Sequence, residues 1–373
     1  MQPLKPGLLA LALAAGLLPA PLAGQSPTRP AADSLDDGPH VYWAGDDRAI
    51  VFHLCGGNIS AVRFEVPDTL AFNGLCADSG LTYRVTAAAP APARHTWDEV
   101  PRILAISDVH GQYDAMVTFL TEAGVIDAAG RWAFGDGHLV VAGDMVDRGP
   151  QVTECLWFLH GLEREAEAAG GRVHVLLGNH ELMVMQHDVR YVHSRYTNGI
   201  VRQLGVRYTD LFGPEMELGR WLRSKPLVVK LNDILFVHGG LAPALAGKGL
   251  DIEALNTIGR ESLDLSSVAL AFSEVPGLLV GSSGPLWYRG YLRGGSGGDS
   301  TISSAELDGV LRFYGATAVV VGHTSTGRIA RLHDGRVFAI DPAVATRGVI
   351  QGLLWENGTF SVVTPGGAVE PFN

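Results

Sequence analysis

The chain has 373 residues with a formal net charge of −11 at pH 7, and 47% of the residues are hydrophobic. This charge argues against nucleic acid as the main partner, because neutralising phosphates requires an excess of Lys and Arg. It does not exclude small phosphorylated substrates, since a binding site can be positive on an acidic protein. The length is sufficient for one large core together with a small second domain.

Residues 1–24 have the pattern of a secretory signal peptide. Lys5 precedes an unbroken apolar run at residues 8–18, and small residues suited to a signal peptidase follow it. The run is shorter than the roughly 20 residues that cross a bilayer, and no later segment is long and apolar enough for a membrane span. We therefore expect a periplasmic or secreted protein with no membrane span after signal cleavage, with an uncleaved anchor as the alternative.

Composition divides the remainder of the chain into four segments. Residues 25–39 contain Pro, Ser and Asp, which predicts a flexible entry. Short β-forming runs separated by Gly, Asp and Asn turns predict a small β-rich module at 40–85. An Ala/Pro-rich stretch at 86–97 is typical of a linker. The last segment, residues 98–373, is then the large domain of the protein.

Three cysteines are present. In an oxidising compartment, Cys55 and Cys76 could form a disulfide within the β-rich module. Cys155 falls near the start of a predicted helix, and we expect it to be a small buried hydrophobic residue.

Five apolar runs in the large domain (98–373) are each followed, directly or after one glycine, by side chains that can bind a metal. The runs are predicted strands at residues 103–107, 139–143, 173–177, 234–237 and 319–321. The polar residues that follow them are Asp108, His110, Asp144, Asp147, Asn179, His180, His238 and His323. Since sites collect at the carboxyl ends of strands in open α/β sheets, five such strand ends are hard to explain by core packing.

Oxygen and imidazole ligands together suit Mn²⁺, Fe or Zn²⁺ better than an ion that prefers thiolates. Two such divalent or trivalent ions can share a bridging carboxylate and a bridging hydroxide, which is then a nucleophile near neutral pH. A phosphoester bound across both ions could be attacked in line, with a nearby Arg balancing the charge of the transition state. A histidine can supply the proton that the leaving alkoxide needs.

Five short motifs occur in order along the chain: Asp-Val-His-Gly at 108–111, Gly-Asp-Met-Val-Asp-Arg-Gly at 143–149, Gly-Asn-His-Glu at 178–181, Val-His-Gly-Gly at 237–240 and Gly-His at 322–323. This set resembles the signature of the calcineurin-like metallophosphoesterases. The Asp-Arg-Gly and Asn-His-Glu forms are similar to the phosphoprotein-phosphatase branch, and the runs at 287–290 and 188–192 resemble the bacterial Shewanella-like protein phosphatases. Over roughly residues 100 to 345, the resemblance implies a four-layer α/β/β/α sandwich with two mixed sheets.

The resemblance also implies a role for each motif residue. It places Asp108, His110 and Asp144 on a first metal, with Asp144 bridging to a second metal that is completed by Asn179, His238 and His323. It makes His180 the general acid, oriented by Asp147. Phosphate binding falls to Arg148, Arg289 and Asn179.

Two neighbouring positions carry further expectations. Many relatives have a second histidine two residues after the one at position 323, where this chain has Ser325. That departure is shared with the phosphatase branch and leaves the first metal with fewer protein ligands. Glu181 is expected to be a structural carboxylate rather than a metal ligand.

We therefore predict a dinuclear metal-dependent phosphomonoester hydrolase, namely a protein phosphatase acting on phosphotyrosine or on phosphoserine and phosphothreonine. Its substrate is a phosphorylated protein or peptide, or a small phosphoester. One alternative is a dinucleoside polyphosphate hydrolase or nucleotidase on the same fold, because Trp287, Tyr288 and Tyr291 could stack a nucleobase as well as a phosphotyrosine ring. Another is a non-catalytic metal- or phosphate-binding protein, although a pure binder has no need of His180 and Asp147.

Overall fold

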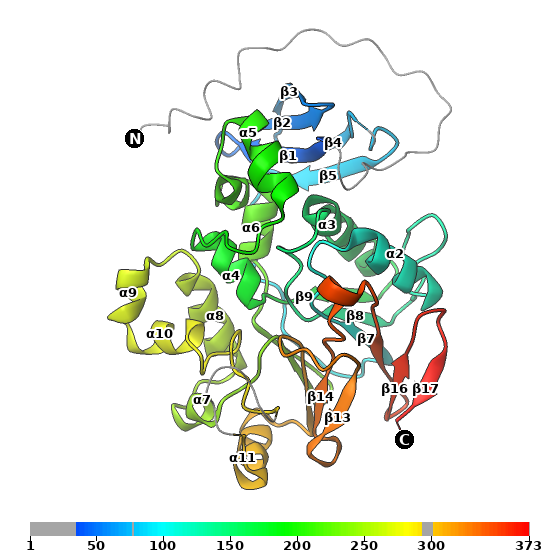
Figure 1. Cartoon of the computed structure of the whole chain (residues 1–373), viewed down its shortest axis with the longest axis vertical. Coiled ribbons are helices and arrows are strands. Elements are labelled where there is room, and N and C mark those ends of the chain that lie inside the picture. The colour runs from blue at the N-terminus through cyan, green and yellow to red at the C-terminus, as the bar shows by residue number, and fades with distance from the viewer. Residues whose placement is uncertain (1–34, 77, 293–300, 373) are drawn as a thin grey trace. The chain divides into compact units, whose positions relative to one another are not determined.

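The computed structural model describes residues 35–76, 78–292 and 301–372 (Figure 1). The predicted signal peptide and most of the predicted flexible entry lie outside these residues. Within the described part of the chain, no helix is long and apolar enough to cross a membrane. The chain forms two compact units, one of residues up to Ala91 with Val189–Arg223, and one of Pro92–Asp188 with Ser224 onward.

The first unit contains the expected β-rich N-terminal region. Its antiparallel sheet has the order β1 (Asp37–Trp43), β2 (Arg48–Cys55) and β3 (Asn58–Glu65), and a separate hairpin pairs β4 (Thr69–Asn73) with β5 (Thr82–Thr86). The last residues of the predicted flexible entry are therefore part of a strand, because β1 begins before position 40. Backbone pairing with β2 fixes them.

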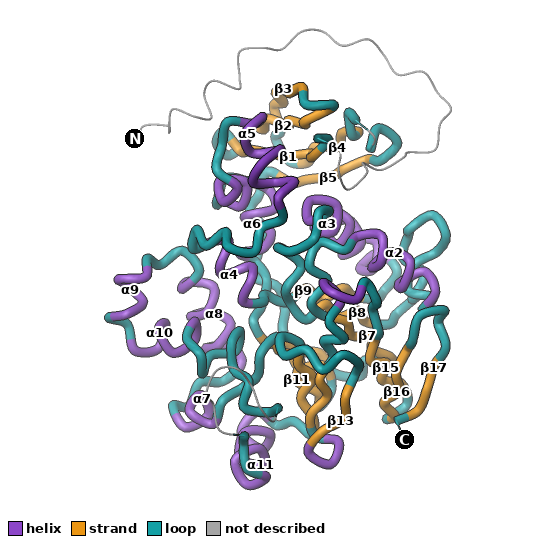
Figure 2. The backbone as a smooth tube through the Cα atoms, in the orientation of Figure 1, coloured by secondary structure: helices purple, strands orange, loops and turns teal. Residues whose placement is uncertain are grey.

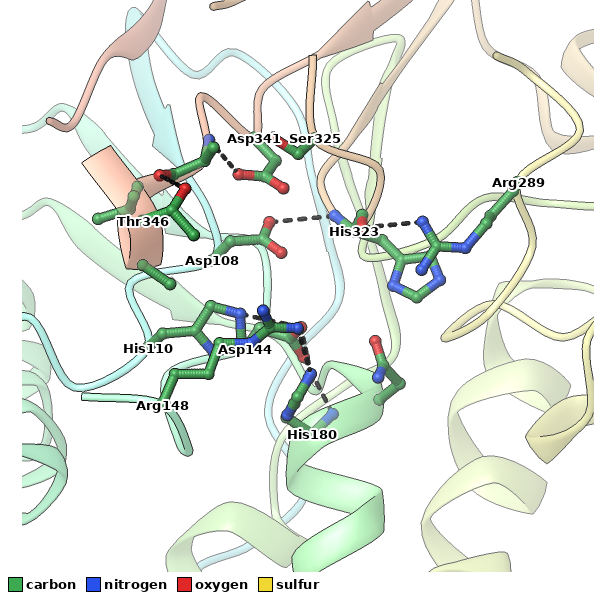
Figure 3. Close-up of a pocket in the computed structure, with 14 residues that line it drawn as sticks. Asp108, His110, Asp144, Arg148, His180, Arg289, His323, Ser325, Asp341 and Thr346 are labelled. Carbon is green, nitrogen blue, oxygen red and sulfur yellow. Dashed lines mark hydrogen bonds and ion pairs between the residues drawn. The ribbon is translucent and has the colours of Figure 1, made fainter. Parts of the chain in front are cut away.

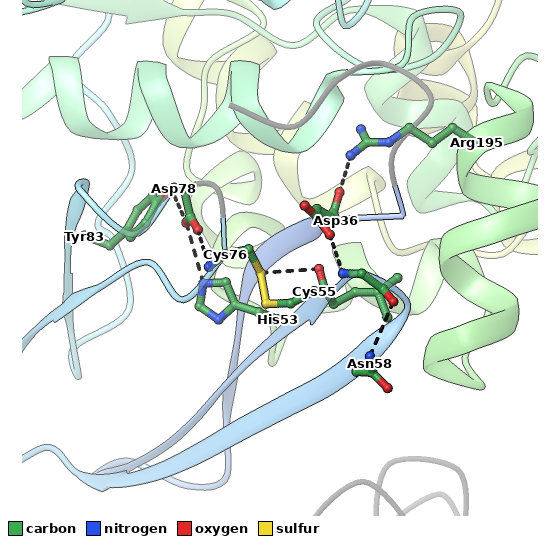
Figure 4. The surroundings of a disulfide bond; sticks show 10 residues. Asp36, His53, Cys55, Asn58, Cys76, Asp78, Tyr83 and Arg195 are labelled. Atoms are coloured by element: carbon green, nitrogen blue, oxygen red, sulfur yellow. Dashed lines mark hydrogen bonds and ion pairs between the residues drawn. A yellow bond between two sulfur atoms is a disulfide. The ribbon is translucent and has the colours of Figure 1, made fainter. Parts of the chain in front are cut away.

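Cys55 and Cys76 form a disulfide, which confirms the predicted pairing (Figure 4). Beside it, Tyr83 donates a hydrogen bond of 2.8 Å to Asp78. Burial alone would raise the pKa of the Asp78 carboxyl, but His53 and Tyr83 outweigh burial and lower it. Cys155 is buried in the second unit and takes no part in the disulfide, as expected.

Residues 189–223 pack within the first unit, so the large domain is not continuous over the predicted range 98–373. The segment contains η2 (Arg195–Ile200), α5 (Val201–Leu204), η3 (Tyr208–Phe212) and α6 (Glu217–Arg223). Two contacts join α6 to β1: the Trp43 indole donates to Glu217 at 2.7 Å, and the Arg220 guanidinium lies 4.1 Å from the Trp43 ring centre. This aromatic and ionic pairing explains why the segment belongs to the first unit.

The second unit contains two mixed six-stranded sheets. In the first sheet, the parallel strands β7 (Arg102–Ile106), β8 (His138–Val141) and β9 (Arg172–Val175) continue into antiparallel strands. Those added strands are β15 (Gly352–Glu356), β16 (Thr359–Val363) and β17 (Val369–Pro371).

In the second sheet, β11 (Ile234–Val237), β12 (Ala318–Val321) and β14 (Val337–Ala339) run parallel. The strands β13 (Ala330–Leu332) and β10 (Val228–Leu231) pair antiparallel with β14 and β11. The edge strand β6 (Thr96–Trp97) lies within the predicted linker and pairs with β10, so the linker ends inside a sheet.

The two sheets pack face to face around one apolar core. Alternating residues of β7, including Ile103 and Ala105, meet residues of the other sheet such as Phe236, Val320 and Phe338. On the outer faces, α3 (Val152–Ala168) packs against β9 beside α2 (Tyr113–Glu122), and α8 (Ile252–Ser262) packs against β10. Figure 2 shows these strands between the helices of the second unit. The layers are helix, sheet, sheet and helix, as the family resemblance implied.

The region of residues 262–304 is partly helical. It contains α9 (Ser267–Ala271), α10 (Glu274–Val280) and the first residue of α11 (Ser304–Tyr314), while its glycine-rich run at 294–298 lies outside the described residues. The remaining helices are α4 (Asn179–Met185), α7 (Pro243–Gly247) and α12 (Val344–Arg347), and one turn of 3₁₀ helix, η4 (His333–Gly335), joins β13 to β14.

Candidate metal centre and active site

Six parallel strands, three in each sheet, direct their carboxyl ends to one pocket. In the first sheet Ile106, Val141 and Val175 are register partners, and the loops that follow them carry the first three motifs. The pocket has a volume of about 290 Å³. The predicted site residues that line it are Asp108, His110, Asp144, Arg148, Asn179, His180, Arg289 and His323 (Figure 3). His238 is fully buried beneath them.

Tight backbone turns aim these side chains into the pocket. Asp108, His110 and Asp144 have φ values of 54°, 48° and 58°, which side-chain-bearing residues adopt at an energetic cost. Backbone hydrogen bonds hold the turns, since the His110 amide donates to the Asp144 carbonyl at 2.9 Å. Gly143 is required, because a Cβ there would lie 2.7 Å from the Gly178 backbone in addition to needing a φ of 84°.

One group of ligand atoms meets around His238. Its Nε2 lies 3.2 Å from Asp144 Oδ1 and 2.9 Å from Asn179 Oδ1, while its Nδ1 donates to the Ala142 carbonyl at 2.8 Å. Asp144, His238 and His323 can each offer an atom to a single ion. The Nε2 of His323 is buried without a hydrogen-bond partner in the described part of the chain. An unpaired buried nitrogen beside carboxylate, amide and imidazole donors fits a metal ion well.

A second group of ligand atoms lies on the other side of Asp144. His110 Nε2 is 3.7 Å from Asp144 Oδ2, and its Nδ1 donates to the Val146 carbonyl at 2.9 Å, which fixes the ring. Asp108 Oδ2 accepts the His323 amide at 3.0 Å. Burial, together with repulsion from Asp341 and Asp144, raises the pKa of Asp108 well above its usual value. Carboxylates crowded in this way fit a bound cation that would offset their charge.

Two of the imidazoles are neutral at physiological pH. Burial lowers the pKa of His110 to about 3. The pKa of His323 is also lowered, first by burial and then by the nearby charge of His238. Each ring therefore keeps a nitrogen lone pair at its own position in the pocket, which a metal ligand requires. Asp144 has a pKa well below its usual value, because His238 and His180 outweigh the effect of burial.

His238 is different and predicts pH-dependent metal binding. Burial alone would lower its pKa, but the Asp144 carboxylate raises it to about 10. A cation must therefore displace a proton from His238 below that pH, so we expect the apparent affinity to rise with pH, by up to about tenfold per unit for one proton. Calorimetric Mn²⁺ titrations at pH 7, in buffers of different ionisation enthalpy, should show release of about one proton or more. Binding without proton release would contradict the assignment of His238.

His180 forms a buried pair with Asp147. Its Nδ1 lies 2.7 Å from Asp147 Oδ2, and its Nε2 faces the pocket, 3.8 Å from Asp144 Oδ2. Burial raises the pKa of Asp147 even though His180 acts in the opposite direction. The Asp147 carboxylate thus fixes one ring nitrogen and leaves the other for the substrate, as expected for an oriented acid.

Two arginines reach the pocket from different loops. Arg148 Nη2 lies 3.3 Å from His180 Nε2. Arg289 Nη1 donates to the His323 carbonyl at 3.1 Å and to the Thr324 hydroxyl at 2.9 Å. Because these bonds use one nitrogen of Arg289, its other guanidinium nitrogens are available to an anion.

Glu181 has the structural role that we expected, since its carboxylate binds backbone amides next to the site. Its two carboxylate oxygens accept the backbone N–H groups of Asp144, Met145, Val146 and Gly178, at distances between 2.7 and 3.1 Å. The carboxylate thus joins the Asp144 turn to the start of α4.

We expected Trp287, Tyr288 and Tyr291 to be able to stack on a substrate ring, and this expectation is wrong for the two tyrosines. Tyr288 and Tyr291 are buried and pack edge to face, with ring centres 5.3 Å apart, and the Tyr291 hydroxyl donates to the Leu241 carbonyl. Trp287 is half-buried and meets the His323 ring edge-on at 5.8 Å. The two tyrosines therefore stabilise the fold through buried contacts and do not face a substrate.

Sequence reasoning missed part of the pocket wall. Asp341 lines the pocket together with Ala343, Val344, Ala345 and Thr346 of the loop and of α12. Asp341 had a detectable pattern, since it follows the apolar run at 337–340 as the other site residues follow theirs. The small residues of α12 had no comparable pattern.

A model of the calcineurin-like phosphoesterase family matches residues 101–326, which is more than half of the chain. The chain belongs to this family. This calcineurin-like phosphoesterase is a metal-dependent phosphatase, and its ordered motifs and α/β/β/α layers are those that the resemblance implied.

A solved structure and a curated relative each match about two thirds or more of this calcineurin-like phosphoesterase, and a third relative matches a shorter part. A cold-active protein-tyrosine phosphatase of a psychrophilic Shewanella species is 34% identical, with a TM-score of 0.82 over 91% of this chain and 99% of that chain. Shewanella-like protein phosphatase 1 of Plasmodium berghei is 28% identical over 65% of this chain and 67% of its own length. A symmetrical bis(5'-nucleosyl)-tetraphosphatase of Methylococcus capsulatus is 34% identical, but over only 38% of this chain and 44% of its own.

Proposed function

We propose that this phosphatase removes phosphate from phosphorylated proteins or peptides, with phosphotyrosine as the preferred residue. The observation that carries the proposal is the similarity to the Shewanella protein-tyrosine phosphatase, which extends over almost the whole of both chains at 34% identity. We also propose export to the periplasm or beyond the cell, based on the signal-peptide pattern at residues 1–24. A mature N-terminus near residue 25 in protein recovered from the periplasm would test the latter.

We propose that the site holds two metal ions of the Mn, Fe or Zn type. Asp108, His110 and Asp144 would hold one ion, and Asp144 with Asn179, His238 and His323 would hold the other. Bound there, the ions supply Lewis acidity toward the phosphoryl group and lower the pKa of bound water. Two groups of ligand atoms each lie within reach of one ion: Asp144 with His238 and His323, which supports the second set, and Asp144 with His110 and His180, which supports His110 and Asp144 in the first. Asp108 is assigned to the first ion because its buried carboxylate lines the same pocket.

The protein's own side chains then orient the phosphate and manage the proton. Arg148 and Arg289 bind phosphate oxygens and stabilise charge in the transition state. Asn179 adds an amide at the same pocket wall. His180, held at Nδ1 by Asp147, gives its Nε2 proton to the oxygen of the departing alcohol. The buried pair and its open nitrogen support this direction of transfer.

The contact between Arg148 and His180 adds a condition to this mechanism. A guanidinium nitrogen can only donate hydrogen bonds, so His180 Nε2 accepts from Arg148 in the present arrangement and carries no proton there. A phosphate in the pocket competes for Arg148 because it offers charged acceptor oxygens. Turning Arg148 to the phosphate frees Nε2 to hold the proton that it later donates.

The alternatives have less support. The similarity to a nucleotide hydrolase covers little more than a third of the chain, and two of the three aromatic side chains considered for stacking are buried. A non-catalytic binder would have no use for the pair formed by His180 and Asp147.

Phosphate release from matched peptides tests the proposal. The Mn²⁺-loaded protein should release phosphate from a phosphotyrosine peptide with kcat/KM at least about tenfold above that for the same peptide with phosphoserine or phosphothreonine, a difference of about 1.4 kcal/mol in transition-state binding. Diadenosine tetraphosphate is offered in parallel. Turnover confined to the dinucleotide would overturn the proposal in favour of nucleotide hydrolysis, and equal rates on all three peptides would remove the phosphotyrosine preference.

A further inference from the structure

Asp341 occupies the same place on its strand as a predicted metal ligand does on the neighbouring strand. Val321 of β12 and Ala339 of β14 are register partners in the parallel pair. His323 lies two residues after Val321, and Asp341 lies two residues after Ala339. Adjacent strands lie only about 4.8 Å apart, so the register itself brings Asp341 to the edge of the sheet from which His323 enters the pocket.

The side chain of Asp341 is fixed and partly open. Its Oδ1 accepts the Ala343 amide at 2.7 Å, and its carbonyl oxygen accepts the Thr326 amide at 3.1 Å. Among the described residues, no hydrogen bond reaches Oδ2. The residue is only 6% exposed and lines the pocket, where Figure 3 shows its carboxylate facing that of Asp108. The carboxylate is therefore largely removed from bulk water, while Oδ2 stays accessible from the pocket to a positively charged ligand.

The surroundings do not supply that positive group at close range. Asp108 and Asp144 face the same pocket and add two further buried carboxylates. The arginines of the pocket bond elsewhere: Arg148 contacts His180, and Arg289 is tied to the loop that follows His323. Ser325, which carries no charge, also lines the pocket. The buried Nε2 of His323, which lacks a partner, independently indicates a ligand in this pocket.

We propose that Asp341 supplies a further carboxylate to the cation site at Asp108, on the side where Ser325 lies. Oδ2 binds the cation, directly or through its bound water, while Oδ1 stays on the Ala343 amide. The inference rests on the metal dependence of the phosphatase and not on which phosphoester it cleaves.

Mn²⁺ binding to the chelator-stripped full chain tests the proposal without an activity assay. Asp341→Asn keeps an oxygen acceptor for the Ala343 amide but removes the negative charge. We expect Mn²⁺ binding at one site to weaken by about 10–100-fold, measured by calorimetry and by metal analysis after desalting. Glu356→Gln is the matched control, because Glu356 is exposed and pairs with Arg102 at the opposite end of β7.

Thermal unfolding separates this role from a structural one. The metal-free Asp341→Asn protein should melt at or above the wild-type Tm, since one of three crowded carboxylates has lost its charge, and Mn²⁺ should raise its Tm by less than it raises that of wild type. Unchanged Mn²⁺ affinity would overturn the proposal. So would a lower metal-free Tm with an unchanged response to Mn²⁺, or a variant that does not fold with or without Mn²⁺, because each would assign Asp341 to the fold alone.

Discussion

Replacing His180 with Asn lowers turnover by about 10²–10⁴-fold on phosphoesters with poor leaving groups and leaves the metal content unchanged. The reason is the position of His180, whose Nδ1 is held by Asp147 at 2.7 Å while its Nε2 faces the pocket. An Asn side chain cannot deliver a proton to the departing oxygen. The loss should shrink on p-nitrophenyl phosphate, because nitrophenolate leaves without protonation more readily than phenolate.

The measurement compares kcat on phenyl phosphate and on p-nitrophenyl phosphate, with bound metal counted by elemental analysis. His187→Asn is the matched control, since His187 is exposed just after α4 and has a φ of 66° that Asn tolerates. His180 also lies close enough to His110 and Asp144 to share an ion with them. A loss of metal in His180→Asn would therefore make His180 a ligand, and full turnover on phenyl phosphate would remove it from the reaction altogether.

The strands that carry the site were predictable because their pattern is local. Each is a short apolar run followed directly by a ligand-type residue, and a parallel sheet places such strand ends at one edge. The order of the motifs then indicated the four layers. The fate of residues 189–223 was not predictable, because their place in the first unit depends on partners distant in sequence, such as Trp43 with Glu217. The order of residues within one short segment does not show which distant residues will contact it.

The same distinction applies within the site. Glu181 was correctly expected to be structural, since it lies one residue beyond the predicted acid on the first turn of a helix. The prediction for Tyr288 and Tyr291 was wrong because an aromatic run in the sequence does not show the direction in which each ring points. Asp341 was detectable by the strand-end pattern, but it lies beyond the five motifs of the family signature. The wall formed by α12 depends on tertiary packing alone.

Replacing Glu181 with Gln should destabilise the protein by about 2–6 kcal/mol. The Glu181 carboxylate accepts four buried backbone N–H groups, two at each oxygen. In Gln, one oxygen becomes an NH₂ group that can only donate, so two of those N–H groups lose their acceptor and face another donor. Each buried donor left without a partner costs about 1–3 kcal/mol. The loss falls on the amides of Met145 and Val146 if NH₂ replaces Oε1, or on those of Asp144 and Gly178 if it replaces Oε2. Either change loosens the turn that carries Asp144, the residue shared by both groups of ligand atoms.

Urea unfolding of the metal-free protein measures this effect, with Glu356→Gln as the control because its carboxylate is exposed. Metal binding gives a second, separable readout. In the described part of the chain the Glu181 carboxylate hydrogen-bonds to backbone amides that fix the Asp144 turn, so the variant should also bind Mn²⁺ about 10–100-fold more weakly. A free energy of unfolding within about 0.5 kcal/mol of wild type would mean that water replaces the lost acceptor. A stability loss with unchanged Mn²⁺ affinity would mean that the cation, once bound, holds the turn without Glu181.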